Sequence, residues 1–468
     1  MNERVYPVKK KEILELRIEK LAFGGKGIGK IADYVIFVKE AIPGDLVQAQ
    51  IFKRKSNFAE ARLLKVIEPS PLRQEAPCPY FGWCGGCTWQ NLSYKEQLRI
   101  KKEQVDESIR HLAGQEAVQV RDTLPSLNIW GYRNKMEFSF SDRRWLLPEE
   151  LNNPLIKNDF ALGLHIPGTF DKILDINACM LQSESANQIL RIVNEYCREK
   201  ELPAYGIRSH EGFMRFLVIR QSHANSGIMV NLVTASREPE LLKPLAEILL
   251  KNVPEIVSIS NIINLQKAQV AFGEEEILLA GQSFITDKIG EYEFKISANS
   301  FFQTNTVQAE QLYAVVLEYA GLTGNEVVWD LYAGTGTISL FLARKAKIVY
   351  ALELIDSAVN DGKKNALEHK AENIRFIAGD LLHNLKGISA KADVIVVDPP
   401  RSGMHPKVSE FLADSEAERI IYVSCNPTTM ARDIQILSRT FRAVKVQPVD
   451  MFPHTYHIES VCLLERIK

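Results

Sequence analysis

The carboxyl-terminal third of the chain repeats a pattern: an apolar run, then a polar or glycine-rich turn, then a helical segment. Strands that alternate with helices along a chain form a mostly parallel sheet with helices on both faces. The sequence therefore predicts a doubly wound α/β domain in this part of the chain. Its runs of strand length are residues 327–331, 348–352, 374–378, 393–397, 420–423 and 456–464.

Acidic residues stand at the ends of three predicted strands, and a glycine-rich turn, residues 332–337 (YAGTGT), follows the first strand. This pattern is typical of a site for an adenosine ribose, with Glu353 accepting hydrogen bonds from both hydroxyls. Dinucleotide binders have a third glycine for the pyrophosphate, but Ser339 stands there, so the sequence favours S-adenosylmethionine as cofactor. Asp380 is predicted near the adenine, and Asp398 near the methionine or a target base.

Cys425 ends the buried run 420–423 and precedes Asn426 and Pro427. Ligands of open α/β sheets bind at this edge, and a helix that starts beyond Pro427 would favour a thiolate. The alternative is a buried thiol that packs as a small apolar residue. A thiolate beside a methyl donor can add to carbon 6 of uracil and thereby activate carbon 5. We therefore predict Cys425 as a nucleophile.

Such an adduct must lose the proton of carbon 5 before elimination frees the enzyme, so the reaction needs a base. Glu459 is the first candidate because its predicted strand lies near the Cys425 strand. His454 and His457 are alternatives, since imidazole titrates near neutral pH. A plain carboxylate on an edge strand is the other interpretation of Glu459.

Three of the seven cysteines lie within ten residues, at Cys78, Cys84 and Cys87. In a chain without an export signal, this spacing indicates a metal or catalytic use. Cys179 is the best candidate for a fourth ligand, whereas Cys197 lies in a helical pattern and is predicted to be core. Three clustered thiols and a distant one fit a [4Fe-4S] cluster better than zinc, which is the alternative.

Residues 10–69 alternate short β-like runs with glycine-rich turns, which predicts a small closed barrel of five strands. Lys26 and the run 53–55 lie on its predicted loops, where phosphate contacts are made. The turn GGKGIG (24–29) and PGD (43–45) resemble a TRAM domain, an RNA-binding barrel. An SH3-like or OB-like spacer is the alternative.

Residues 93–114 are predicted as a helix, with Ser93 and Glu96 as a capping box and Gly114 at the end. Residues 132–285 are predicted as mixed α and β. The basic residues of the first helix are predicted to form a solvated face: Lys95, Arg99, Lys101 and Lys102.

The whole chain resembles the RNA uracil-5-methyltransferase family. The resemblance implies a TRAM barrel over 8–69, a mixed α+β central domain with a [4Fe-4S] cluster over 70–290, and a Rossmann-like, S-adenosylmethionine-dependent methyltransferase domain over 291–468. Ala333 departs from the pattern, because many members have cysteine there. The matching strings are C-x5-C-x2-C at Cys78, then SFFQTN, DLYAGTGT, DPPRSG, YVSCNP and FPHTYHIE.

The resemblance also implies a role for each matching residue. Cys425 would be the nucleophile and Glu459 the base. The cluster ligands would be Cys78, Cys84, Cys87 and Cys179. The contacts to the cofactor would be Gln303, Tyr332, Thr337, Glu353, Asp380 and Asp398.

The implied substrate is RNA, with the target uridine flipped out of its stack. Members that carry the cluster mostly act on large-subunit ribosomal RNA, so the resemblance favours 23S rRNA over tRNA. No obligate protein partner is implied. The charged amino terminus lacks a secretory pattern, and no apolar run approaches the length of a membrane span, so we expect a cytoplasmic protein without a membrane partner.

Three other activities fit the residues less well. A non-catalytic RNA-binding factor would be expected to lack Cys425 or the acidic strand ends. An RNA cytosine-5-methyltransferase uses related thiol chemistry, but the FPHTYHIE ending and the cysteine cluster disfavour it. Methyltransferases that act on amino groups have an aromatic residue after Asp-Pro-Pro, whereas Arg401 stands there in this chain.

Overall fold

The computed structural model describes residues 7–151 and 153–467, which fold into two compact units. The first unit contains the described part of Met1–Glu75, Trp89–Ser126 and the chain from Gln308 onward. The second contains Ala76–Thr88 and Leu127–Val307. No helix among the described residues is both long and apolar enough to cross a membrane.

The amino-terminal strands form a small β structure, with six strands rather than the predicted five, in the order β1-β5-β6-β4-β3-β2. Alternate residues of β4 are buried, which is the pattern of a sheet with one face on a core. Gly27 and Gly29 lie within β3 rather than in the predicted turn; a Cβ at Gly27 would lie 2.8 Å from the Ala41 carbonyl oxygen. The strands are β1 (Ile13–Arg17), β2 (Lys20–Leu21), β3 (Gly27–Ile31), β4 (Tyr34–Val38), β5 (Leu46–Arg54) and β6 (Phe58–Glu68).

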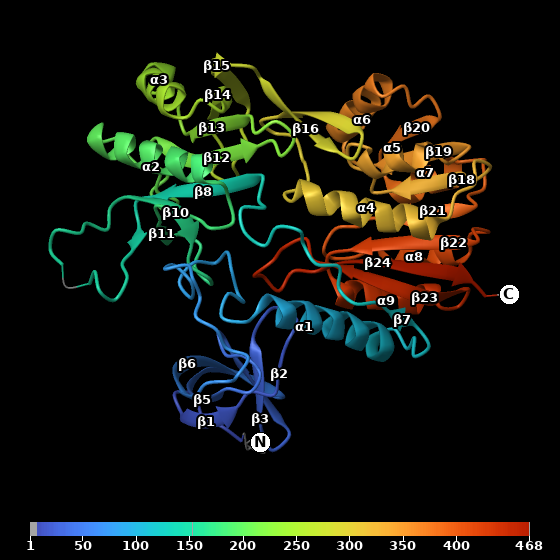
Figure 1. Ribbon diagram of the computed structural model, residues 1–468, viewed down its shortest axis with the longest axis horizontal. Helices are drawn as coiled ribbons and strands as arrows, with labels where there is room; N and C mark the ends of the chain where they lie inside the picture. The colour runs from blue at the N-terminus through green and yellow to red at the C-terminus, as the bar shows by residue number, and fades with distance from the viewer. Residues whose placement is uncertain (1–6, 152, 468) are drawn as a thin grey trace. The chain divides into compact units, whose positions relative to one another are not determined.

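The carboxyl-terminal sheet of the first unit confirms the predicted doubly wound domain. Its strands are β7 (Gln119–Val120), β18 (Val327–Leu331), β19 (Ile348–Glu353), β20 (Ile374–Ala378), β21 (Val394–Val397), β22 (Arg419–Ser424), β23 (Phe441–Val449) and β24 (Glu459–Arg466). They have the order β20-β19-β18-β21-β22-β24-β23-β7, and Figure 1 shows β18, β19 and β20 in orange and β22, β23 and β24 in red.

β18 to β22 run parallel to one another, whereas β24 runs antiparallel between β22 and β23. All of β21 is buried, as expected for a strand covered on both faces. The prediction missed β7 and β23, and it began the last strand at residue 456 rather than Glu459. The helices between these strands are α4 (Thr306–Ala320), α5 (Thr337–Ala343), α6 (Asp356–Glu368), α7 (Leu381–Gly387), α8 (Pro406–Ala413) and α9 (Pro427–Leu437).

The predicted helix 93–114 is α1 (Tyr94–Glu107), which continues as a π-helical turn, Ser108–Leu112. The predicted capping box does not form: the Ser93 side chain makes no capping hydrogen bond, and Glu96 pairs with Arg99 instead. The prediction of a solvated basic face is wrong for Lys101, whose side chain is fully buried. Lys101 lies on the side of α1 that packs against the carboxyl-terminal sheet, within the first unit.

The second unit contains the predicted mixture of helices and strands. Its main sheet has the order β15-β14-β13-β12-β8-β10-β11-β9, and β16 pairs with β17. Buried residues of α2 and α3 form its core together with the sheet. The elements are β8 (Lys135–Ser141), β9 (Arg144–Trp145), β10 (Ala161–His165), β11 (Ile173–Asp175), α2 (Glu184–Glu199), β12 (Met214–Gln221), β13 (Ile228–Thr234), α3 (Lys243–Asn252), β14 (Ile256–Ile263), β15 (Glu275–Gly281), β16 (Phe284–Ile289) and β17 (Tyr292–Ser297).

Candidate active site

The sheet brings the predicted nucleophile and base together. Cys425 directly follows β22 and is half-buried. β24 pairs antiparallel with β22, and Ser424 lies opposite Ser460, so the next residues along, Cys425 and Glu459, are neighbours across the two strands. Asp398 follows β21, the parallel neighbour on the other side of β22. The thiol and two carboxyl groups therefore lie at one edge of the sheet.

Burial raises the pKa of all three groups, and neighbouring charges add to the rise for Cys425 and Glu459. Burial raises the pKa of Cys425 to about 11; the charges of Glu459 and Asp398 add to this, and Arg401 opposes it. Burial, with the charge of Asp398, also raises the pKa of Glu459 well above its ordinary value. Burial therefore opposes the thiolate that the start of α9 is predicted to favour.

Among the three candidate bases, Glu459 is the one whose charge acts on Cys425. His454 is buried, and its Nδ1 lies 3.2 Å from Nε2 of Gln97. The ring of His457 packs against that of Tyr456, with 4.2 Å between centroids. The two imidazoles are thus engaged in packing and hydrogen bonding, while the charge of Glu459 acts on the thiol.

Arg401 is a site residue to which the sequence analysis gave no role. The side chains of Asn426 and Thr429, at the start of α9, donate hydrogen bonds to its carbonyl oxygen, at 3.2 and 3.3 Å. Its guanidinium favours the charged forms of both Cys425 and Glu459. The signal in the sequence is its place directly after Asp-Pro-Pro at a strand end.

The glycine turn and Glu353 form a second part of the site. The backbone N–H groups of Gly334 and Ile355 donate to the two carboxylate oxygens of Glu353, at 2.9 and 3.0 Å. Gly334 and Gly336 have φ values of 55° and 74°, which disfavour other residues, and a Cβ at Gly334 would meet no atom within 4 Å. The carboxylate is therefore fixed beside an open turn, as binding of a ribose requires.

Tyr332 and Thr337 flank this turn. Tyr332 has a φ of 63°, unusual for a residue with a side chain. Burial raises the pKa of its hydroxyl to about 12, with a further contribution from Asp433, and the backbone N–H of His405 opposes the rise. Since that hydroxyl faces α8 and α9, Tyr332 presents its backbone to the turn. Thr337 is the first residue of α5.

Asp330, the first residue of the string DLYAGTGT, is a further acidic residue close to this turn. It is buried within β18, and its Oδ2 accepts a hydrogen bond of 2.5 Å from the hydroxyl of Ser339. Burial raises its pKa to about 7, and the charges of Asp398 and Glu353 add to this. Ser339, which stands where a dinucleotide binder has glycine, therefore donates a hydrogen bond to the carboxyl group of Asp330.

Two predicted cofactor contacts have structural partners of their own. Asp380 follows β20 and caps α7, because its Oδ1 accepts from the N–H of His383 at 2.9 Å. Gln303 belongs to the second unit, unlike the other predicted contacts. Its carbonyl oxygen accepts a 2.7 Å hydrogen bond from the side chain of Asn134.

The four predicted cluster ligands are half-buried in the second unit. Burial raises the pKa of Cys84 to about 11; nearby Cys179 and Cys78 add to this and Arg133 opposes it. Arg133 is also close enough to Cys87 for the two to interact electrostatically. Arg133 thus interacts electrostatically with Cys84, Cys87 and Cys179. Among the described residues, however, no group of three or more His, Cys, Asp or Glu could hold a metal ion as placed.

Two other sequence predictions can be compared with the structure. Cys197 is buried in α2, which confirms its assignment to the core. Lys26 and Lys53, predicted to contact phosphates, both pair with the carboxylate of Glu60, the second at 2.5 Å. Hydrogen bonds from these two lysines lower the pKa of Glu60. Part of the positive charge of the barrel is therefore neutralised by its own carboxylate.

Comparisons with known proteins agree with this geometry. Residues 245–467 match the family model described as tRNA (Uracil-5-)-methyltransferase, and residues 7–64 match the TRAM domain. An "Uncharacterized RNA methyltransferase" of Chlorobaculum tepidum is 42% identical over 98% of this chain and 97% of its own length. A protein with the same description from Bacteroides thetaiotaomicron is 41% identical over 95% of this chain and 100% of its own length.

One solved structure matches nearly the whole chain. It is the Pyrococcus abyssi tRNA (uracil-54, C5)-methyltransferase in complex with S-adenosyl-L-homocysteine, with a TM-score of 0.73 and 28% identity. The match covers 96% of this chain and 100% of the other. By these matches the chain belongs to the RNA uracil-5-methyltransferase family, and it is an S-adenosylmethionine-dependent RNA methyltransferase.

Proposed function

We propose that this protein methylates carbon 5 of a uridine in RNA by covalent catalysis, with Cys425 as the nucleophile and Glu459 as the base. The observation that carries the proposal is the pairing of β22 with β24, which makes the thiol and the carboxyl group neighbours at the edge of the sheet. The raised pKa of Glu459 supports its role, because a carboxylate whose pKa is raised toward neutrality is a stronger base.

In the proposed reaction, Cys425 loses its proton and its sulfur adds to carbon 6, which converts the ring into an enolate. Arg401 supports this step because its charge favours the thiolate. S-adenosylmethionine supplies the methyl group that carbon 5 takes up. Glu459 then removes the proton of carbon 5, the bond between sulfur and carbon 6 breaks, and Cys425 leaves as a thiolate, which regains from solvent the proton that it lost to solvent before the addition. The target uridine must be flipped out to reach Cys425.

The residues around the glycine turn fit the cofactor. We propose that Glu353 accepts from its ribose hydroxyls and that the backbone of residues 332–337 lines its site. The open space at Gly334 and the fixed carboxylate support this assignment. Asp398 would serve the methionine moiety or the target base. The remaining proposed contacts are Gln303, Tyr332, Thr337 and Asp380.

We also propose that Cys78, Cys84, Cys87 and Cys179 hold a [4Fe-4S] cluster. Four thiolates around a cluster carry net negative charge, and Arg133, which interacts electrostatically with these thiols, would balance part of it. The cluster would have a structural role, because methyl transfer moves no electrons. Loss of bound iron and sulfide in a Cys179→Ser variant, with both retained in Cys197→Ser, tests the assignment.

For the substrate we propose 23S rRNA, on the strength of the sequence motifs that accompany the cysteine cluster. Transfer RNA is the second candidate, because the P. abyssi tRNA enzyme matches 96% of this chain. A shared domain arrangement therefore does not discriminate between the two RNAs. The deciding experiment maps 5-methyluridine in ribosomal and transfer RNA from cells with and without this protein, and repeats the assay with purified protein on both RNAs. If no uridine in either RNA depends on the protein, the proposed function is wrong.

A further inference from the structure

A buried ion pair joins α1 to the segment that precedes Glu459. The Nζ atom of Lys101 lies 2.6 Å from Oδ1 of Asp450, and neither side chain is exposed to solvent. Burial lowers the pKa of Lys101, and the charge of Asp450 opposes this. Removing two charges from water costs several kcal/mol per ion, so such a pair is weak evidence for stability alone. Its position suggests another use.

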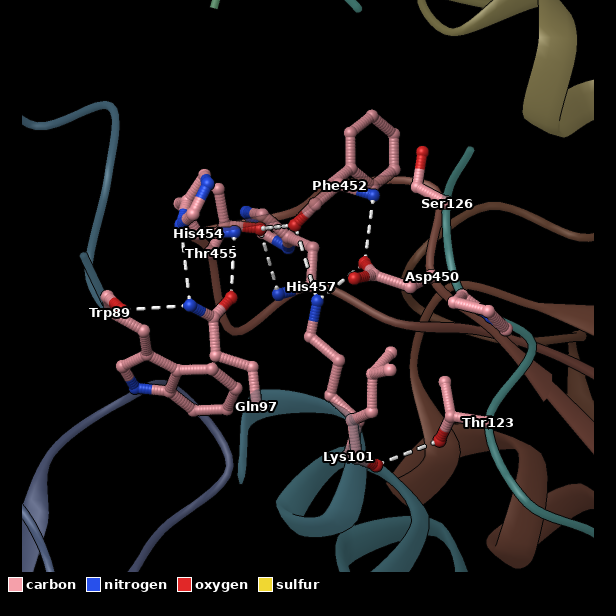
Figure 2. Close-up of polar contacts among 12 residues, drawn as sticks. Trp89, Gln97, Lys101, Thr123, Ser126, Asp450, Phe452, His454, Thr455 and His457 are labelled. Carbon is pink, nitrogen blue, oxygen red and sulfur yellow. Dashed lines mark hydrogen bonds and ion pairs between the residues drawn. The ribbon is translucent and has the colours of Figure 1, made fainter. Parts of the chain in front are cut away.

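The pair holds the chain where it leaves β23. Oδ1 of Asp450 also accepts from the N–H of Phe452 at 3.1 Å, and Nζ of Lys101 donates to the carbonyl of Phe452 at 3.2 Å. The hydroxyl of Thr455 donates to the same carbonyl at 2.8 Å. Lys101 therefore holds the backbone carbonyl of Phe452 directly and its N–H through Asp450, as Figure 2 shows.

Gln97, one helical turn before Lys101, holds the next part of this segment. Its Oε1 accepts from the N–H of His454 at 2.9 Å, and its Nε2 lies 3.2 Å from the ring Nδ1 of His454. The carbonyl of His454 accepts from the N–H of Trp89 at 3.0 Å. His454 has a φ of 65°, a strained value that persists only where surrounding contacts enforce it. Figure 2 shows the two contacts between the side chain of Gln97 and His454.

The segment 450–458 connects β23 to β24, and Val449 pairs directly with Glu459. Whatever fixes this loop also fixes the first residue of β24. Residues i and i+4 lie on the same face of a helix, so Gln97 and Lys101 form a two-point clamp on the loop. We propose that Gln97 and Lys101 are positioning residues that hold Glu459 opposite Cys425. This inference rests on the proposed role of Glu459 as the base.

The same helix is fastened to the barrel. Nε2 of Gln104 donates to the carbonyl of Leu21 at 3.3 Å, and Lys20 pairs with Glu107 at 2.9 Å. The rings of Phe23 and Tyr456 meet edge to face, with 5.9 Å between centroids. α1 therefore contacts both the TRAM barrel and the loop before Glu459.

The test uses three variants of the full-length protein. Lys101→Met with Asp450→Leu replaces the pair by apolar residues, which is often neutral for stability, so this variant is expected to fold. It nevertheless loses the hydrogen bonds to Phe452. Gln97→Leu removes the second point of the clamp. Lys102→Met is the matched control, because Lys102 lies next to Lys101 but makes an exposed pair with Asp122. Circular dichroism and melting curves verify folding.

The first measurement needs no RNA. Alkylation of Cys425 by iodoacetamide, followed over pH by mass spectrometry of its peptide, reports the charges that face it: Glu459, Asp398 and Arg401. If the clamp holds Glu459 in place, the folded double variant and Gln97→Leu react at pH 8 about threefold to tenfold faster than wild type, as does Glu459→Gln. The control keeps the wild-type profile. A wild-type profile in both folded clamp variants overturns the inference.

The second measurement follows turnover on the RNA that the wild type methylates. The clamp variants are expected to lose about tenfold or more in kcat with KM unchanged, and to accumulate the protein–RNA adduct on denaturing gels, because removal of the carbon 5 proton becomes slow. If the wild type methylates no uridine, the proposed function fails, while the alkylation profiles still decide whether the clamp positions Glu459. Unchanged kcat in folded clamp variants also overturns the inference.

Discussion

Two sets of ionisable groups in the first unit, one half-buried and one fully buried, differ in the sign of the charges they bring together. At the edge of the sheet, Cys425, Asp398 and Glu459 can all become negative, and burial raises the pKa of each. Under α1, Lys101 and Asp450 have opposite charges and lie 2.6 Å apart. The first set brings like charges together, which is unfavourable for folding but suited to proton transfer. In the second set each charge is balanced by its partner, which suits the pair to holding a loop.

The largest expected effect is on the first set. Cys425→Ala should reduce methylation by about 10³-fold or more, because the covalent route is lost. Binding of S-adenosylmethionine should be unchanged, since the glycine turn and Glu353 are untouched. Calorimetric titration measures the affinity for the cofactor, and a methyl-transfer assay measures the rate of methylation. Cys462→Ala, which removes a buried thiol of β24, is the control and should retain turnover. Methylation by Cys425→Ala at the wild-type rate would reject the nucleophile.

The next effect is on stability and belongs to the second set. Lys101→Met leaves Asp450 buried without its counter-charge and should lower the free energy of unfolding by about 3–5 kcal/mol. Adding Asp450→Leu should restore most of this loss, because an apolar pair replaces the ionic one. Urea denaturation measures the loss of stability in the single variant and its recovery in the double variant. Equal loss in the two variants would show that packing rather than unpaired charge causes the effect.

Removing one carboxyl group from the first set should raise the free energy of unfolding, which is the opposite of the effect expected for Lys101→Met. Asp398 has a pKa of about 6 in the folded protein against an ordinary value of 3.8. The folded state therefore holds a proton that the unfolded chain has released, and this stabilising contribution, complete below pH 3.8, is lost as the pH rises through 6. Asp398→Asn should thus raise the free energy of unfolding by about 1–3 kcal/mol at pH 8. At low pH it should bring little gain.

Denaturation of Asp398→Asn and wild type at both pH values, together with a methylation assay, tests this trade-off. The variant is expected to be more stable at high pH and to have lost activity. Lys102→Met, at an exposed pair, should change stability by less than about 1 kcal/mol at either pH. A variant destabilised at pH 8 would mean that the carboxylate of Asp398 makes favourable contacts that outweigh its burial.

The two sets also differ in how far the sequence could predict them. Cys425, Glu353, Asp380 and Asp398 follow apolar runs, so local pattern and the rules of parallel sheets were enough to place them at one edge. The pairing of Glu459 with Cys425 depends on β24 entering between β22 and β23, and β23 was not predicted. Lys101 and Asp450 are 349 residues apart in sequence, and no periodicity links them.

Helical charges are usually solvated, and this general tendency led to the wrong prediction for Lys101. Its neighbour Lys102 follows the tendency, with a side chain that is 38% exposed. The cysteine cluster shows a further limit. The spacing of Cys78, Cys84 and Cys87 suggests ligands, but the described residues place no three such groups for a metal ion. Cluster assembly would have to draw the thiols together, which sequence spacing alone cannot describe.

A finer prediction concerns the balance of charge around Cys425 itself. Arg401 lowers the pKa of the thiol and Glu459 raises it, so replacing each should move the alkylation of Cys425 in opposite directions. At pH 8, Arg401→Met should slow the reaction with iodoacetamide by about threefold, and Glu459→Gln should accelerate it by about threefold or more. Peptide mass spectrometry measures both rates. Shifts of the same sign would mean that accessibility rather than charge controls the thiol.

The smallest expected effect lies in the barrel, where opposite charges meet at the surface rather than in the core. Glu60 neutralises part of the charge of Lys26 and Lys53. Glu60→Gln should therefore tighten RNA binding by about twofold to fivefold at low salt, and the gain should vanish at high salt because exposed charges are screened. Fluorescence anisotropy with a ribosomal RNA fragment measures the effect, and Glu107→Gln, at the pair with Lys20, is the matched control. A gain that persists at high salt would contradict the electrostatic explanation. Weaker binding would show that Glu60 arranges the two lysines for phosphate rather than competing with it.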